Sequence, residues 1–189
     1  MLKRLSLFVI TLSFFLSAQQ VFADEKKSYT TQHTNHAPRI DGKLDDECWK
    51  EISPATDFIT HDPQFGKQPT YKTEVRVLYD NNAIYIGAKM YDPEPKKIGN
   101  SLVLRDEGMD QDYFLVGFDT YHDGVNAYRF RVTASNVQAD ERLKSDNLDQ
   151  TWDAVWNSKT KIDDCKLLLL ALMHEVKLQL RDLAPRLNV

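Results

Sequence analysis

The sequence contains few cysteines, and none of its apolar runs is as long as a membrane-spanning helix. Two cysteines among 189 residues permit at most one disulfide, between Cys48 and Cys165, provided that the chain reaches an oxidising compartment. Cys48 shares an apolar stripe with Leu44 and Ile52 at spacings of four residues, which favours a small buried side chain. Spacing alone leaves the pairing of the two cysteines open.

The motifs of common catalytic and phosphate-binding sites are also missing. The sequence has no G-x-S-x-G, P-loop, G-x-G-x-x-G or C-x-x-C pattern, and its five histidines lack convincing metal-ligand spacing. Acidic residues are numerous, but a sequence does not give the separation of two carboxylates that a glycosidase needs. The formal net charge of −4 argues against a nucleic acid partner, because phosphate contacts need a basic face. It is compatible with a neutral ligand or a cation.

Residues 1–23 have the pattern of a secretory signal peptide. Lys3 and Arg4 supply a positive start, an apolar stretch follows over 5–16, and V-F-A at 21–23 forms a cleavage signal. The apolar stretch is shorter than the roughly 20 residues of a spanning helix, which favours a removable leader over an uncleaved anchor. We therefore expect an exported protein, periplasmic, on the cell surface or secreted, with no membrane span after cleavage.

A mobile polar arm over 24–37 is expected to lead into one β-rich domain over 38–164. A short helix is expected over 44–52, with acidic residues in its first turn and Pro54 after its end. The clearest pattern is a hairpin over 73–92, in which apolar residues alternate on both sides of a D-N-N turn. Further strands are expected over 112–119, 127–133 and 154–156. Short strands with regular turns predict an all-β antiparallel sandwich.

The alternation is strictest over 127–133, and the last part of the chain departs from it. The pattern A-Y-R-F-R-V-T predicts that Tyr128, Phe130 and Val132 face the core and that the two intervening arginines face outward. Residues 165–189 are rich in leucine, lack alternation and have a local helical preference. They are expected to form an atypical helical tail.

Trp152 and Trp156 are the candidate ligand platform. An indole ring offers a flat apolar surface with a polar edge, which matches the apolar C–H face of a sugar ring. A spacing of four residues would place both rings on one face of a strand. The alternative is that both rings fill the core. Trp49 follows the expected helix and is interpreted as structural.

Charged residues surround the strand expected over 112–119. They are Arg105, Asp106, Asp110, Asp112 and Asp119. Fixed pairs of arginine and carboxylate would suit a groove for sugar hydroxyls, and the alternative is an exposed loop with surface ion pairs. A bound calcium ion is a second interpretation, since calcium prefers several carboxylate and carbonyl oxygens, although no EF-hand loop is present. The candidate groove residues are Trp152, Trp156, Arg105, Asp112 and Tyr128.

An ordered set of segments resembles the family 9 carbohydrate-binding module, in the version found at the N-terminus of large bacterial envelope proteins. The segments are 40–49 (I-D-G-K-L-D-D-E-C-W), 74–92, Arg105-Asp106, 112–123, 127–132 and 152–156 (W-D-A-V-W). The resemblance covers roughly 38–164. It implies a jelly-roll-like sandwich that binds sugars without cleaving them, with aromatic rings that grip a terminal sugar and, in some members, a structural calcium ion.

The resemblance therefore predicts a noncatalytic module that binds a polysaccharide or oligosaccharide and serves polysaccharide catabolism. One alternative is an accessory fragment of an exported glycoside hydrolase, and another is a structural module of an envelope protein that contacts a protein partner. Longer relatives continue past the matching region with a further strand. The leucine-rich stretch therefore leads to the hypothesis that the gene is interrupted or frame-shifted after Asp164, which the other reading frames of the downstream DNA would test.

Overall fold

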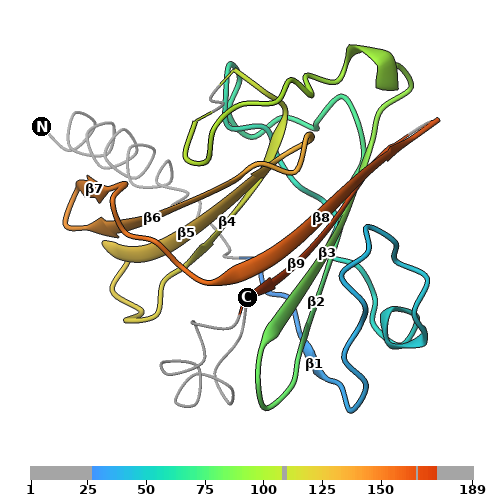
Figure 1. Cartoon of the computed structure of the whole chain (residues 1–189), viewed down its shortest axis with the longest axis horizontal. Helices are drawn as coiled ribbons and strands as arrows, with labels where there is room; N and C mark the ends of the chain where they lie inside the picture. Colours follow the sequence, from blue (N-terminus) through green and yellow to red (C-terminus); the bar gives the residue numbers. More distant parts are fainter. Residues whose placement is uncertain (1–26, 108–109, 165, 174–189) are drawn as a thin grey trace, which may run out of the picture.

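Two stacked β-sheets make up the part of the chain that the computed structural model describes, residues 27–107, 110–164 and 166–173 (Figure 1). One sheet has five strands in the order β1-β2-β3-β9-β8, and the other has four in the order β4-β5-β6-β7. The elements are β1 (Gln32–His33), β2 (Thr73–Tyr79), β3 (Ile84–Tyr91), β4 (Tyr113–Phe118), β5 (Asn126–Thr133), β6 (Gln138–Lys144), β7 (Asn147–Asp149), β8 (Trp156–Asp163) and β9 (Lys166–Met173), with short 3-10 turns η1 (Glu47–Trp49) and η2 (Pro95–Lys97). The all-β, largely antiparallel arrangement agrees with the predicted sandwich.

The main core lies between the two sheets. Ile84 and Ile86 of β3 pack in one buried cluster with Phe130 and Val132 of β5. Phe130 and Val132 are each only 2% exposed, as the alternation predicted. Tyr128 is partly buried against the same cluster. The inward face of β5 therefore supplies aromatic and aliphatic side chains to a core shared by both sheets.

The two arginines of β5 depart from the expectation that both face outward into solvent. Arg129 binds Glu141 at 3.1 Å across the β5–β6 pair and is only partly exposed. Arg131 is 6% exposed, and its guanidinium lies over the Tyr113 ring at 5.5 Å from the centroid. The alternation of residues correctly assigns the aromatic and aliphatic side chains to one face of β5 and the arginines to the other. It does not show which side chains cover the face that carries the arginines.

The hairpin expected over 73–92 is confirmed as β2 and β3, which pair from Thr73↔Met90 to Tyr79↔Ile84. The carboxylate of Asp80 fixes its turn by accepting the N–H groups of Asn82 at 2.6 Å and Ala83 at 2.8 Å.

The segment 40–49 covers the outer face of the five-stranded sheet. Trp49 is 2% exposed and Cys48 7% exposed, in a cluster with Leu78 and Tyr85. A Cβ atom on Gly87 of β3 would lie 2.2 Å from Leu44 Cδ2 and 3.3 Å from the Trp49 ring. Trp49 is thus structural and Cys48 is buried, as expected, and Cys48 is a free cysteine in the described part of the chain. Cys165 lies outside the described residues.

The helix expected over 44–52 is reduced to the single turn η1. Short helices are marginal on their own and depend on tertiary packing. Here the apolar stripe is buried directly against the strands, so one turn is sufficient to place Cys48 and Trp49.

The polar arm expected over 24–37 is held against β2 where the structure describes it. The strand β1 pairs with β2 in parallel, and Thr34 N–H donates to Tyr79 O at 2.8 Å. Thr34 is 7% exposed. The predicted signal peptide lies outside the described residues, and the described residues include no helix that is long and apolar enough to cross a membrane.

The helical tail expected from residue 165 is wrong for Lys166–Met173, which forms β9 between β3 and β8. Leu167, Leu168 and Leu169 are 4%, 8% and 0% exposed. A strand that is covered on both faces is a continuous apolar run, and its sequence does not show the alternation of a half-buried strand. The lost alternation that motivated the frame-shift hypothesis therefore has a structural cause. Residues 174–189 lie outside the described part.

Candidate functional site

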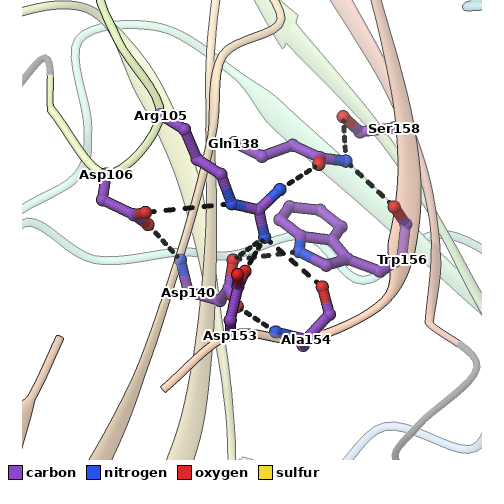
Figure 2. A network of polar contacts seen from close by, with 8 residues as sticks. All are labelled: Arg105, Asp106, Gln138, Asp140, Asp153, Ala154, Trp156 and Ser158. Carbon is purple, nitrogen blue, oxygen red and sulfur yellow. Dashed lines mark hydrogen bonds and ion pairs between the residues drawn. The ribbon is translucent and has the colours of Figure 1, made fainter. Parts of the chain in front are cut away.

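A polar network around Arg105 joins the loop before β4 to β6 and to the chain that enters β8 (Figure 2). The guanidinium binds Asp140 Oδ1 at 2.5 Å and donates to Gln138 Oε1 at 3.1 Å and Ala154 O at 3.3 Å. It also pairs with Asp153 at 2.8 Å. Figure 2 shows these groups converging on one side chain. Arg105 therefore fixes three separate segments relative to one another.

Asp140 is the buried centre of this network. Its side chain has no exposed surface, and it accepts hydrogen bonds from Ala154 N–H and from Trp156 Nε1, the latter at 3.3 Å. Burial raises the pKa of Asp140, and the hydrogen bonds and the charge of Arg105 offset only part of that shift. The arrangement is that of a structural buried ion pair, whose arginine is 39% exposed at its outer edge.

The two tryptophans of the candidate platform both pack on the Phe130 ring, with centroid distances of 5.9 Å for Trp152 and 5.4 Å for Trp156, but they differ in burial. Trp156 begins β8, is 6% exposed and packs on Phe130 with ring centroids 5.4 Å apart. Its ring faces the core, which was the alternative to a ligand platform. Trp152 precedes β8 and is only partly buried, with its ring centroid 4.9 Å from that of Tyr128. The two predicted residues that lie together at the margin of the core are thus Tyr128 and Trp152.

Asp112 fixes a loop at a different place from the Tyr128–Trp152 pair. Its Oδ2 accepts Gly99 N–H at 2.6 Å, and its own N–H donates to Gly99 O at 3.3 Å. Asp119 similarly accepts the N–H groups of Asp123 at 3.2 Å and Gly124 at 2.8 Å. These carboxylates therefore serve the backbone around β4.

The carboxylates proposed for calcium do not form a metal site among the residues that the structure describes. No group of three or more histidine, cysteine, aspartate or glutamate side chains in that part of the chain could hold a metal ion. Since Asp112 and Asp119 are already bonded to backbone N–H groups, the described residues do not fit the calcium interpretation.

Tyr128 borders a hollow at one end of the four-stranded sheet, which we call the Tyr128 cleft. A pocket of about 210 Å³ is lined by Tyr121, Asn126, Ala127, Tyr128, Arg142, Leu143 and Lys144. A second pocket of about 400 Å³ is lined by Arg142, Lys144, Asn147, Leu148, Asp149, Gln150 and Thr151. The two pockets share Arg142 and Lys144, so they adjoin along the end of β6.

Hydrogen bonds among the polar side chains of the Tyr128 cleft hold these side chains in place. Arg142 lies opposite Tyr128 in the β5–β6 register, and its Nη2 binds Asp149 Oδ2 at 2.8 Å. Asp149 also accepts the Thr151 hydroxyl at 2.7 Å. The hydrogen bonds from Thr151 and Arg142 hold the pKa of Asp149 below its usual range. Tyr121 is 61% exposed at the other wall.

Sequence reasoning singled out Tyr128 and Trp152 as candidates, but it did not single out Arg142, Asp149 or Tyr121, which the structure places around the same hollow. The segment 138–144 (Q-A-D-E-R-L-K) is largely polar and gives no strong strand signal. Arg142 becomes a neighbour of Tyr128 only through the β5–β6 pairing. A prediction of that hairpin, with its turn at 134–137, would have been the signal that could find it.

Comparison with known proteins identifies the family. Residues 40–166 match the model of the carbohydrate family 9 binding domain-like family, and no curated protein matches significantly. Two solved structures show the same fold: a family 9 carbohydrate-binding module from Caldicellulosiruptor kristjanssonii in complex with cellotriose, and one in complex with glucose. Each has 19% identity and a TM-score of 0.51 over 76% of this chain, and the match covers 67% of the cellotriose-bound chain and 68% of the glucose-bound chain. Since the family model spans well over half of the sequence, the chain belongs to the carbohydrate family 9 binding domain-like family.

Proposed function

We propose that this protein binds carbohydrate without cleaving it and that the Tyr128 cleft holds the sugar. The observation that carries the proposal is the Tyr128 ring, which lines a hollow with polar walls. The Trp152 ring supports it from behind, with 4.9 Å between the two centroids, and does not itself line the hollow. Aromatic rings offer flat apolar surfaces for the C–H face of a pyranose. The solved module from Caldicellulosiruptor kristjanssonii was crystallised with cellotriose and with glucose, which supports a saccharide as the ligand class.

The polar lining of the Tyr128 cleft supplies the remaining contacts. Arg142 is held by Asp149 at 2.8 Å and keeps further N–H groups for ligand oxygens. Asn126 and Lys144 line the same hollow. Binding pockets of this kind combine apolar surface with a few fixed polar groups that set orientation. The cleft therefore offers both stacking surface and hydroxyl partners.

The number of carboxylates in the cleft favours binding of a sugar over its hydrolysis. Most glycosidases place two carboxyl groups across the scissile bond. Asp149 is the single carboxylate among the residues that line the two pockets, and it is engaged by Arg142 and Thr151. This supports a noncatalytic module over a hydrolase. An accessory place in a longer exported hydrolase is the alternative, and release of reducing sugar from a polysaccharide panel would favour it.

We also propose that the protein is exported and takes part in polysaccharide use, on the basis of the leader-like pattern over 1–23. Fractionation of the native host into cytoplasm, periplasm and medium tests the location. The remaining alternative, an envelope module that contacts protein and no sugar, predicts recovery with envelope partners and no retention on glycans.

The substitution Tyr128→Ala tests the cleft. It removes the ring that lines the hollow, and we expect affinity for the bound saccharide to fall about two- to twelvefold, since such aromatic contacts contribute about 0.5–1.5 kcal/mol beyond area burial. Affinity electrophoresis in polysaccharide gels, followed by calorimetry with the best oligosaccharide, measures the loss.

The matched control is Phe65→Ala, because Phe65 is 72% exposed and does not line the cleft. It should bind like the wild type. Folding of both variants is checked by their urea midpoints. Equal binding by folded Tyr128→Ala and wild type would exclude this cleft, and no retention of the wild type on any glycan would reject carbohydrate binding itself.

A further inference from the structure

We propose a second saccharide-binding pocket, formed by the loop that precedes β2 and separate from the Tyr128 cleft. Its volume is about 480 Å³, and the rings of Phe58 and Tyr71 both line it. The two side chains are 39% and 43% exposed. We call this the Phe58 pocket. Its volume is within the range of about 300–1,000 Å³ that is usual for small-ligand sites.

The other lining groups define the class of ligand. Hydroxyl, amide and carboxylate groups come from Thr56, Asp57, Gln68 and Thr70, and they offer several donors and acceptors. Such a wall is too polar for an acyl chain. The Lys72 ammonium is bound to Glu74 at 2.6 Å, so the lining provides no unpaired cation for a phosphate. Two aromatic residues among hydroxyl, amide and carboxylate groups match a pyranose, since a carboxylate accepts hydrogen bonds from sugar hydroxyls.

Hydrogen bonds hold the walls of the Phe58 pocket in place. Within the loop, Thr60 N–H donates to Lys67 O and Gly66 N–H to Thr60 O, both at 2.9 Å. At its ends, Ala55 pairs with Val75, and Tyr91 N–H donates to Lys72 O at 2.9 Å. A wall that is already ordered loses less conformational entropy when a ligand binds. The pocket is therefore organised before any ligand arrives.

The backbone of Asp57 takes a left-handed turn with a φ angle of +58°, which aspartate tolerates better than most residues. Its carbonyl oxygen accepts a bond from Lys27 Nζ. Asp57, which lines the pocket, is thereby tied to the N-terminal arm.

The Phe58 pocket and the Tyr128 cleft lie at different ends of the molecule. Figure 1 shows the loop before β2 at the top of the view, whereas the β6–β7 turn that borders the cleft is at the left. The two sites share no lining residue. Ligand binding at each can therefore be measured and abolished separately.

Amide shifts of the isotope-labelled full chain test the pocket during titration with glucose, xylose, galactose, mannose and cellotriose. We expect at least one of these sugars to cause saturable shifts in 56–73. Phe58→Ala and Tyr71→Ala should each weaken that response about tenfold while the response around Tyr128 stays intact. Phe65→Ala is the control, because it changes an exposed ring of the same loop that does not line the pocket.

The outcomes distinguish the two proposals. If the sugars shift the amides of 126–128 and 142–144 and leave 56–73 silent, the Phe58 pocket is not a saccharide site and the Tyr128 cleft stands. If only 56–73 responds, the proposed cleft is rejected and the pocket is supported. If neither region responds to any of the five sugars, both proposals are overturned. An unchanged response of 56–73 in folded Phe58→Ala would also reject the pocket.

Discussion

At the scale of single residues, the carboxylate of Asp140 joins three parts of the chain. It receives the Ala154 N–H, the Trp156 indole N–H and the Arg105 guanidinium while its own side chain is fully buried. A buried charge without its partners is costly because its hydration is lost and not replaced. The sequence singled out Arg105, Asp106 and Trp156, whereas Asp140 was missed because it lies on the largely polar strand β6.

We expect Asp140→Ala to destabilise the protein by about 2–5 kcal/mol, because it leaves the buried N–H groups of Ala154 and Trp156 without an acceptor, at about 1–3 kcal/mol each. Arg105 is partly exposed and keeps its contacts with Gln138 and Asp153. The control is Asp153→Ala, which removes a carboxylate 2.8 Å from the same guanidinium but 75% exposed; it should cost less than about 1 kcal/mol. Urea unfolding of both variants measures the difference. Similar losses for the two would show that burial does not set the strength of this network.

The stability of the protein at acidic pH depends in part on Asp80, in the turn between β2 and β3. Burial alone would raise its pKa, but the N–H of Asn82, the Tyr85 hydroxyl and the N–H of Ala83 outweigh burial and hold the pKa below its usual value. The folded pKa is then lower than the unfolded one, about 3.9. Asp80 therefore contributes stability at higher pH, and this contribution is lost as the pH falls through the folded pKa.

In Asp80→Asn, this acid-sensitive contribution should be absent. The wild type is expected to be the more stable protein near pH 6, and the difference should narrow as the pH falls below about 4. The pH dependence that Asp140 contributes has the opposite sign. Its pKa is raised in the folded state, so its contribution to stability is lost as the pH rises through the folded pKa. The difference between variant and wild type in urea isolates Asp80, and a difference that stays constant with pH would contradict its assignment.

At the scale of elements, strands with alternating residues or a clear turn beside them were predictable, and a mostly polar strand and a leucine run were not. The hairpin of β2 and β3 and the strand β5 followed from alternation. The strand β4 was expected from the apolar run over 112–119, which predicted a central strand covered on both sides, but β4 is an edge strand of the four-stranded sheet. The polar strand β6 and the continuously apolar strand β9 did not follow from alternation, because alternation reports only a difference between two faces. The Tyr128 cleft was therefore half predictable: Tyr128 and Trp152 have a sequence signal, whereas Arg142 lies on a strand that has none.

The segment 40–49 and β3 fit each other at Gly87. Gly87→Ala would place a methyl group 2.2 Å from Leu44 Cδ2 and 3.3 Å from the buried Trp49 ring, so Leu44 must shift and the methyl group also crowds Trp49. We expect a destabilisation of about 1–3 kcal/mol. Gly117→Ala in β4 is the control, because its nearest neighbour is Arg129 Cγ at 3.8 Å, and it should be neutral or slightly stabilising. Chemical denaturation compares them, and a neutral Gly87→Ala would show that the 40–49 segment packs loosely.

At the scale of the whole molecule, β9 joins the first hairpin to β8 and completes the five-stranded sheet. It pairs along its full length with β3 on one side and β8 on the other. The sequence of the leucine-rich stretch departs from the pattern of the preceding strands. Over Lys166–Met173 it nevertheless forms an inner strand of the five-stranded sheet. The family match itself ends at residue 166.

Leu169→Ala tests the place of β9 in the core. Leu169 is 0% exposed, and its truncation should cost about 2–5 kcal/mol. Leu102→Ala, at a side chain that is 85% exposed, should leave the free energy of unfolding nearly unchanged. Thermal and urea unfolding give both values. A loss of less than about 1 kcal/mol for Leu169→Ala would be incompatible with the cavity that such a substitution leaves in a packed interior.

The position of β9 also has a consequence for biosynthesis. It is the last of the described strands to leave the ribosome, yet it lies between two strands that are made earlier. Until it emerges, the edges of β3 and β8 that it will cover are open to pairing with other chains. The nascent protein therefore passes through an interval in which delayed translation or a shortage of chaperones favours aggregation over maturation.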